Sequence, residues 1–193
     1  PRFERVTLPD AADVTVMGMG FDGERVWVTT SRGLYVRDRG SWHRFTTAQG
    51  LRDDNLLFLV VRRDGEVCAS YLAPYGLTCL RYADGQIREL RHIDQQAGLS
   101  SPVPYFLAED AAGRLWVGGA TGVAIFDGDE VDRFTRAGGA PGDDCNANAT
   151  WVAPSGDVWI GTSSGAGLFD GARYRGRPPL PTVKFGRGHV GET

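Results

Sequence analysis

The sequence predicts an all-β protein, a β-propeller of about four four-stranded blades. A hairpin segment recurs: GRLWVGGATGVAIFD at residues 113–127 is matched by GDVWIGTSSGAGLFD at 156–170 and GERVWVTTSRGLYV at 23–36. A divergent copy, GEVCASYLAPYGLTCLRY, spans 65–82. The repeat period of about 44 residues is that of one propeller blade. Glycine supplies 27 of 193 residues, which favours many tight turns between short strands.

Each copy is predicted to contain the same four strands in the same order. An apolar inner strand comes first, at 14–20, 56–61, 103–108 or 149–153, and such continuous apolar runs are typical of strands covered on both faces. A turn glycine and the central hairpin follow, and a second glycine turn leads to a fourth strand. A single domain over 1–193 is expected, with blades at 7–46, 51–91, 99–135 and 143–176. Residues 177–193 form a tail or the start of a further strand.

One large side chain marks the second strand of each repeat. This position holds Trp27, Cys68, Trp116 and Trp159. A ring in the middle of a blade fills the wedge between neighbouring sheets. We therefore interpret these residues as core and not as ligand contacts.

The two ends of the chain bear on how the propeller closes. Arg2-Phe3-Glu4 repeats the fourth-strand pattern of Arg44-Phe45-Thr46, so we expect the chain to begin with an outer strand. An open arc would expose sheet edges and blade faces. We expect either part of a larger propeller or a ring closed within the chain or assembled by oligomerisation, and the sequence leaves that choice open.

Composition excludes some partners. The net charge of −3 provides no global field for nucleic acid. No apolar run approaches the roughly 18 residues needed to cross a bilayer, so no direct membrane insertion is expected. The sequence carries no signal peptide, and the basic segment 172–193 is interpreted as a solvated end.

Several motifs repeat with fixed spacing. They are Gly50-Leu51 with Asp54-Asn55, Leu115-Trp116-Val117-Gly118, and Gly167-Leu168-Phe169-Asp170-Gly171. Together they resemble the two-component regulator propeller repeat of bacterial sensor proteins. The resemblance implies a periplasmic or other extracytoplasmic sensory module whose output domain lies outside this chain. Members of that family usually carry more repeats, and the second repeat here lacks the tryptophan.

Cysteine placement predicts a crosslink in the divergent second repeat. Cys68 takes the tryptophan position, and Cys79 falls opposite it when the hairpin is folded about Ala73-Pro74. Opposed Cβ atoms in a non-hydrogen-bonded pair lie close enough for a disulfide. The alternative is a pair of reduced, buried thiols. Cys145 has no evident partner and is expected to be free.

Polar residues near the starts of the inner strands are the candidate ligand site. Counting back ten residues from each turn glycine gives Asp13, Asn55, Val103 and Asn146, which could ring one mouth of the channel. Asn148 and Tyr105, near the same strands, complete the candidate set. The alternative is that these side chains cap the turns by bonding to the backbone. The D-x-N-x-N spacing at 144–148 lacks the glycine and glutamate of a calcium loop, so no metal is expected.

Catalysis finds little support in the sequence. His43 and His92 belong to or follow outer strands, His189 lies in the tail, and no nucleotide or hydrolase motif occurs in a strand-to-helix setting. Some related propellers are lyases with a channel histidine and a metal, but no histidine lies on an inner strand here. We expect a non-enzymatic ligand-recognition module without a cofactor, binding a small ligand or a protein partner. The alternatives are a protein-interaction scaffold using Tyr75, Trp42 or Tyr105, and, last, a propeller lyase.

Overall fold

The chain is built from antiparallel sheets. The computed structural model describes residues 2–10 and 13–171. Four sheets follow one another along the chain, each a simple up-and-down meander. Two 3-10 turns, η1 (Thr47–Gln49) and η2 (Arg136–Gly138), are the helical elements within these residues. The all-β class predicted from the repeats is confirmed.

Each sheet is one blade, with its strands in sequence order from the inside outwards. Blade 1 contains β1 (Val16–Asp22), β2 (Arg25–Thr30), β3 (Gly33–Asp38) and β4 (Ser41–Phe45). Blade 2 contains β5 (Leu56–Val61), β6 (Val67–Tyr71), β7 (Leu77–Ala83) and β8 (Gln86–Ile93). Blade 3 contains β9 (Pro104–Glu109), β10 (Leu115–Gly119), β11 (Gly122–Asp127) and β12 (Glu130–Phe134). Blade 4 contains β13 (Cys145–Val152), β14 (Val158–Thr162) and β15 (Gly165–Phe169).

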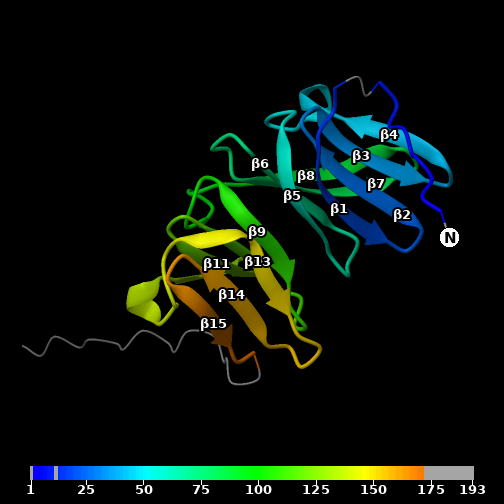
Figure 1. Cartoon of the computed structure of the whole chain (residues 1–193). Coiled ribbons are helices and arrows are strands. Elements are labelled where there is room, and N and C mark those ends of the chain that lie inside the picture. Colours follow the sequence, from blue (N-terminus) through cyan, green and yellow to red (C-terminus); the bar gives the residue numbers. More distant parts are fainter. Residues whose placement is uncertain (1, 11–12, 172–193) are drawn as a thin grey trace, which may run out of the picture.

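The blades are arranged as a four-bladed β-propeller. The inner strands pack side by side in the order β1, β5, β9, β13. Among the described residues no packing of similar extent joins β13 back to β1. Figure 1 shows blade 1 and blade 4 at opposite ends of the row, with blades 2 and 3 between them.

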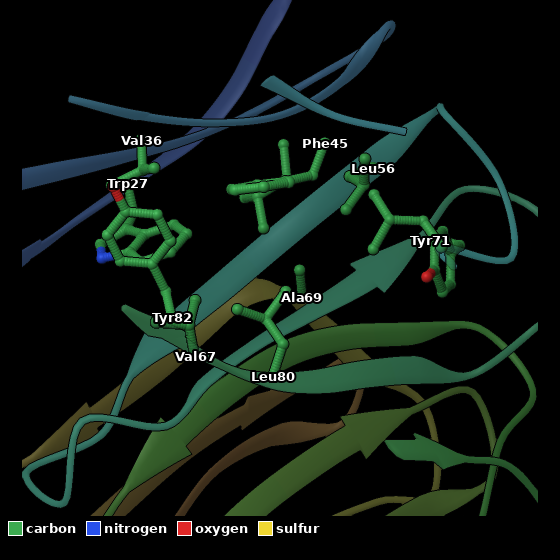
Figure 2. Close-up of a cluster of buried hydrophobic side chains, with 11 residues drawn as sticks. Trp27, Val36, Phe45, Leu56, Val67, Ala69, Tyr71, Leu80 and Tyr82 are labelled. Atoms are coloured by element: carbon green, nitrogen blue, oxygen red, sulfur yellow. The ribbon is translucent and has the colours of Figure 1, made fainter. Parts of the chain in front are cut away.

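The core consists of the layers between successive blades. Figure 2 shows the first layer, where Trp27 and Val36 of blade 1 meet Val67, Leu80 and Tyr82 of blade 2. Trp27 lies edge-on to Tyr82, with 5.5 Å between ring centroids. Such an edge-to-face pair adds about 1 kcal/mol to the burial of the rings.

The other two layers repeat this arrangement. Cys68 and Cys79 of blade 2 pack with Leu115 and Phe126 of blade 3. Trp116 of blade 3 packs edge-on to Phe169 of blade 4 at 4.7 Å. The interpretation of the tryptophan position as core is therefore confirmed for Trp27, Cys68 and Trp116, each at most 1% exposed. It is wrong for Trp159 in the described structure, where this side chain is 44% exposed because no following blade covers it.

One glycine position explains why the repeats tolerate no side chain at the start of the third strand. Gly33, Gly76 and Gly122 have φ of +126°, +73° and +110°. A Cβ there would lie 2.2 to 2.6 Å from the carbonyl oxygen of Phe45, Ile93 or Phe134. The last residue of each fourth strand passes directly over the hairpin, and only glycine leaves room for it.

The end strands differ from the expectation of strands covered on both faces. Met19 and Phe21 of β1 are exposed, as is Trp151 of β13, because no blade covers these sides of the arc in the described structure. The N-terminal expectation is also wrong: residues 2–8 form no strand, and Phe3 is fully exposed. The strand predicted around Tyr174, and the tail at 177–193 with His189, lie outside the described residues.

The last inner strand begins earlier than predicted. It runs from Cys145 where the sequence indicated 149–153, so the Asp-Asn cluster belongs to the strand. Cys145 and Trp151 are six residues apart, whereas the corresponding pair Leu56 and Val60 in β5 is four apart. The two extra residues enlarge a bulge that every described inner strand has at this place.

Candidate functional site at the starts of the inner strands

Backbone hydrogen bonds define a rim where the inner strands begin. At this rim a carbonyl oxygen accepts a hydrogen bond from the residue that follows the second strand: Thr15 from Ser31 (3.0 Å), Asn55 from Leu72 (3.1 Å) and Asp144 from Ser163 (3.0 Å). These three residues are structurally equivalent. Counting back ten residues finds Asn55 but places Asp13 and Asn146 two residues from their equivalents. The causes are the tighter β1–β2 turn and the bulge in β13.

Capping at this rim is carried out by aspartates next to the candidate residues. Asp53 Oδ1 accepts a hydrogen bond from the backbone N–H of Asn55 at 2.7 Å. Asp54 Oδ1 accepts one from the amide of Thr47 (2.7 Å), at the start of η1. Asp143 Oδ1 accepts one from the amide of Arg136 (2.6 Å), at the start of η2. The turn-capping role that was the alternative for Asn55 and Asn146 is thus filled by other side chains.

The side-chain amides of the candidate asparagines are available for hydrogen bonds to a ligand. Within the described structure no side-chain hydrogen bond is recorded for Asn55, Asn146 or Asn148. Asn146 and Asn148 are exposed, and Asn55 is half-buried. An amide carries two donors and an acceptor with two lone pairs. These side chains are therefore able to bind a polar group from outside the chain.

The β13 bulge sets the last two amides apart from the other rims. Asn148 has φ of +53°, a left-handed conformation that asparagine tolerates better than most residues. Ala149 crosses close to Gly161, where a Cβ would lie 2.8 Å from the alanine Cβ. Gly161 thus makes room for this bulge. The register shifts at the same place in all four described inner strands, but β13 has two more residues there than the others.

Strand packing brings most of the candidate set to one side of the molecule. Tyr105 is the second residue of β9 and is half-buried. Because β9 packs against both β5 and β13, Tyr105 lies between the strands that carry Asn55 and Asn146. Asp13 is exposed, has φ of +57° and precedes β1, at the far end of the row from β13. No contact among these side chains is recorded, so their joint role stays a prediction.

Blade 2 holds a charge cluster that the sequence reasoning missed. Glu66 is 7% exposed and receives hydrogen bonds from Arg62 (2.5 Å) and Arg91 (2.8 and 3.0 Å). Burial alone would raise the pKa of Glu66, but the bonds and charges of Arg91 and Arg62 outweigh it and lower the pKa below 4.5. A charged residue on each side of a turn glycine, as in R-R-D-G-E at 62–66, was the available signal.

The disulfide predicted from the hairpin register is present beside this cluster. Cys68 and Cys79 are directly paired across β6 and β7, with Cα atoms 4.0 Å apart. Cys145 is free and buried, and burial raises the pKa of its thiol. Glu66, Cys68 and Cys79 form a compact group with potential ligand atoms within 4.8 Å of one another. They do not suit a metal, because both sulfurs are in the disulfide and two arginines hold the carboxylate.

A second buried chain of polar groups runs through blade 2. The Tyr71 hydroxyl lies 2.5 Å from Thr78 Oγ1, which lies 2.7 Å from His92 Nδ1. Burial raises the pKa of Tyr71. Burial, and then the charge of Arg52, lower the pKa of His92. His92 lies on outer strand β8 and His43 on outer strand β4, so neither belongs to an inner strand.

A hollow of about 390 Å³ lies between blades 3 and 4. Its lining is mainly apolar and includes Trp116, Phe134 and Phe169, with the loop from Gly138 to Gly142 at one side. The hollow borders β15, and the chain continues from there into residues that the structure does not describe. We therefore assign no ligand to it.

The fold is shared with solved structures at low identity. The chain is similar to the extracellular domain of a protein named as a hybrid two-component system from B. thetaiotaomicron (13% identity, TM-score 0.58), covering 87% of this chain and 29% of that one. Virginiamycin B lyase from Staphylococcus aureus gives 14% identity and a TM-score of 0.62, covering 92% of this chain and 60% of the lyase.

The computationally designed protein Ika4 gives 15% identity and a TM-score of 0.62, covering 87% of this chain and 98% of the designed chain. This chain therefore spans less than a third of that extracellular domain but nearly the whole designed protein. No protein-family model matches the sequence, and no curated protein matches it. The similarity establishes the fold. Among the described residues, no helix has the length and apolar character needed to cross a membrane.

Proposed function

We propose that this chain is a non-enzymatic recognition module of an extracytoplasmic bacterial sensor. It binds a small polar ligand at the rim where β5, β9 and β13 begin. The observation that carries the proposal is the β13 bulge, which presents Asn146 and Asn148 in exposed positions without hydrogen-bond partners in the described structure. Their capping role is filled by Asp143, so they are free to serve a ligand.

The chemistry of the rim suits binding. Amides recognise polar groups without adding charge, and an aromatic ring such as Tyr105 supplies a flat apolar surface with a hydroxyl at its edge. The two described histidines are on outer strands and not on inner strands. Two features support an extracytoplasmic location: the disulfide, which persists in oxidising compartments, and the likeness to an extracellular sensor domain.

A ligand screen tests the proposal. Thermal shift followed by calorimetric titration would be run with a panel of neutral sugars, amino acids and dipeptides. For a panel member that stabilises the protein, N146A/N148A is expected to weaken binding by about tenfold or more, the loss expected for two polar contacts. The matched control is Gln86→Ala, which removes an exposed amide where β8 begins. Equal affinity in the double variant and the wild type would remove this site.

The second candidate is a protein-interaction scaffold, and a specific observation favours it. Leu72 and Tyr75 are exposed in the long hairpin loop of blade 2, at 54% and 43%. Trp42 is a weaker candidate, because it is half-buried, whereas Tyr75 is exposed although each packs edge-on to one tyrosine ring. If no panel member stabilises the protein and L72S/Y75S loses a protein partner in pull-down, the scaffold replaces the small-ligand sensor.

A further inference from the structure

The three internal blade interfaces follow one rule. In each, the side chain at the tryptophan position of one blade packs on the next blade. There it contacts a row of three directly paired residues, one from each of the first three strands. Trp116, for example, packs on the row formed by Val152, Val158 and Phe169. Trp27 and Cys68 face blades 2 and 3 in the same way. Each blade therefore has a forward face, which carries this residue, and a backward face, which receives it.

Blade 4 exposes its forward face. Its row is Trp151, Trp159 and Leu168, paired across β13, β14 and β15. These side chains are 58%, 44% and 53% exposed. The equivalent row in blade 3 is Ala108, Trp116 and Ile125, which are 9%, 1% and 2% exposed. Three adjacent large apolar side chains at this exposure are unusual on the surface of a soluble monomer and mark a site of interaction.

Blade 1 exposes part of the complementary backward face. Farther along the same face Val28 and Tyr35 are buried, and the Tyr35 hydroxyl donates to the carbonyl oxygen of Pro9 at 3.4 Å. The row equivalent to Val152, Val158 and Phe169 is Phe21, Val26 and Arg37. Phe21 is 65% exposed, and its neighbour Met19 is 58% exposed. Arg37, also exposed, stands at the position where Phe169 meets Trp116 inside the chain. An arginine there would lie over the ring of a docked tryptophan, a cation–π arrangement worth about 1 kcal/mol or more.

We propose that a second copy of this chain covers both faces, with the forward face of blade 4 docked on the backward face of blade 1 of its partner. Within one chain these faces lie at opposite ends of the row (Figure 1), and among the described residues no strand packing of the extent seen between neighbouring blades joins them. A head-to-tail contact produces a ring when its rotation closes. Two chains related by a two-fold axis would form two such contacts and complete a ring of eight blades, within the usual range of propellers.

Sedimentation velocity of the full chain at micromolar concentration is the test. The expected species has a mass of about 42 kDa, twice the 20.9 kDa of one chain. Trp159→Glu and Phe21→Glu each remove one side of the same contact. Each is expected to raise the dissociation constant by about 30-fold or more, as for a central interface residue. The control Leu72→Glu changes an exposed apolar residue outside both faces and is expected to leave the dimer intact.

Circular dichroism establishes that each variant is folded, which is expected because the two substituted side chains are 65% (Phe21) and 44% (Trp159) exposed. A 21 kDa monomer in the wild type would overturn the proposal and would indicate that the chain itself covers these faces, or that blades of a longer chain do. Species larger than the dimer would overturn ring closure by two copies. A dimer unaffected by both substitutions would place the interface elsewhere.

Discussion

The first three strands of blades 2 and 3 pair in the same register, but different side chains stabilise them. In blade 3, Asp110 accepts hydrogen bonds from Arg114 Nε (2.6 Å) and Trp116 Nε1 (2.8 Å). In blade 2, Arg62 and Glu66 occupy the same two positions with the charges exchanged. Cys68, bonded to Cys79, stands where Trp116 faces Ile125.

The difference shows what the fold requires of this position. Both blades keep an opposite-charge pair across the β-turn and a fully buried filling on the forward face. In blade 3 the carboxylate of the pair accepts a hydrogen bond from the ring of its own blade, and Arg114 lies over the ring of Phe169 in blade 4, 6.0 Å from its centroid. In blade 2 the pair extends outwards, since Arg62 also reaches Glu109 (3.3 Å) and the carbonyl oxygen of Gly113 (2.7 Å) in blade 3. A ring held by a local hydrogen bond has thus been replaced by a covalent crosslink and a network between blades.

Removing the ring of blade 3 should have the largest effect. Trp116→Ala is expected to cost about 4 kcal/mol in free energy of unfolding, because it leaves a cavity against Phe169 and removes a donor to Asp110. Urea unfolding followed by circular dichroism measures it. Trp42→Ala, at a half-buried outer-strand position, is the matched control and should cost less than half as much. Equal losses in the free energy of unfolding would show that the tryptophan position contributes no more to stability than an outer-strand position.

Removing the crosslink of blade 2 should come second. The disulfide joins residues 11 apart, and a loop of that length is expected to contribute about 3 kcal/mol. C68A/C79A should lose about that much in urea unfolding. A reductant should weaken the wild type but not the double variant. Cys145→Ala, which removes a buried free thiol, should keep the response to reductant. Wild-type stability that is insensitive to reductant would contradict the prediction.

The charge network of blade 2 should contribute less and should depend on pH. Burial raises the pKa of Glu66, but the hydrogen bonds and charges of Arg91 and Arg62 outweigh it and hold the pKa below its ordinary value. A depressed pKa in the folded state stabilises the protein above that value, and the contribution is lost as pH falls through the folded pKa. Glu66→Gln is expected to cost about 2 kcal/mol at pH 7.

The pH profile distinguishes this charge effect from a packing effect. The stability difference between the wild type and Glu66→Gln should shrink as the pH falls below about 4. A difference that stayed constant down to acid pH would assign the loss to packing. Glu89→Gln, at an exposed carboxylate on β8, is the control and should change stability by less than about 0.5 kcal/mol at either pH.

Much of this architecture could be predicted from the sequence, because it follows from local spacing. The glycine positions, the tryptophan position and the placement of Cys68 opposite Cys79 all depend on the two-residue period of a hairpin. The bulge in β13 could not be predicted, since two inserted residues leave no compositional mark and shift Asn146 away from the equivalent of Asn55. The exchanged charges of Arg62 and Glu66 became meaningful only when the structure set them beside Asp110 and Arg114.

The smallest expected effect separates the ring from its hydrogen bond. Trp27 Nε1 is buried and has no hydrogen-bond partner within the described structure, whereas Trp116 Nε1 donates to Asp110. Trp27→Phe and Trp116→Phe remove similar volume from similar layers. Because only the second removes a hydrogen bond to a buried carboxylate, leaving Asp110 Oδ2 with the bond from Arg114 Nε alone, it should cost about 1 kcal/mol more in urea unfolding. Equal costs would mean that the hydrogen bond from Trp116 Nε1 to Asp110 adds no stability. The layer between two blades would then need only an aromatic ring at this position.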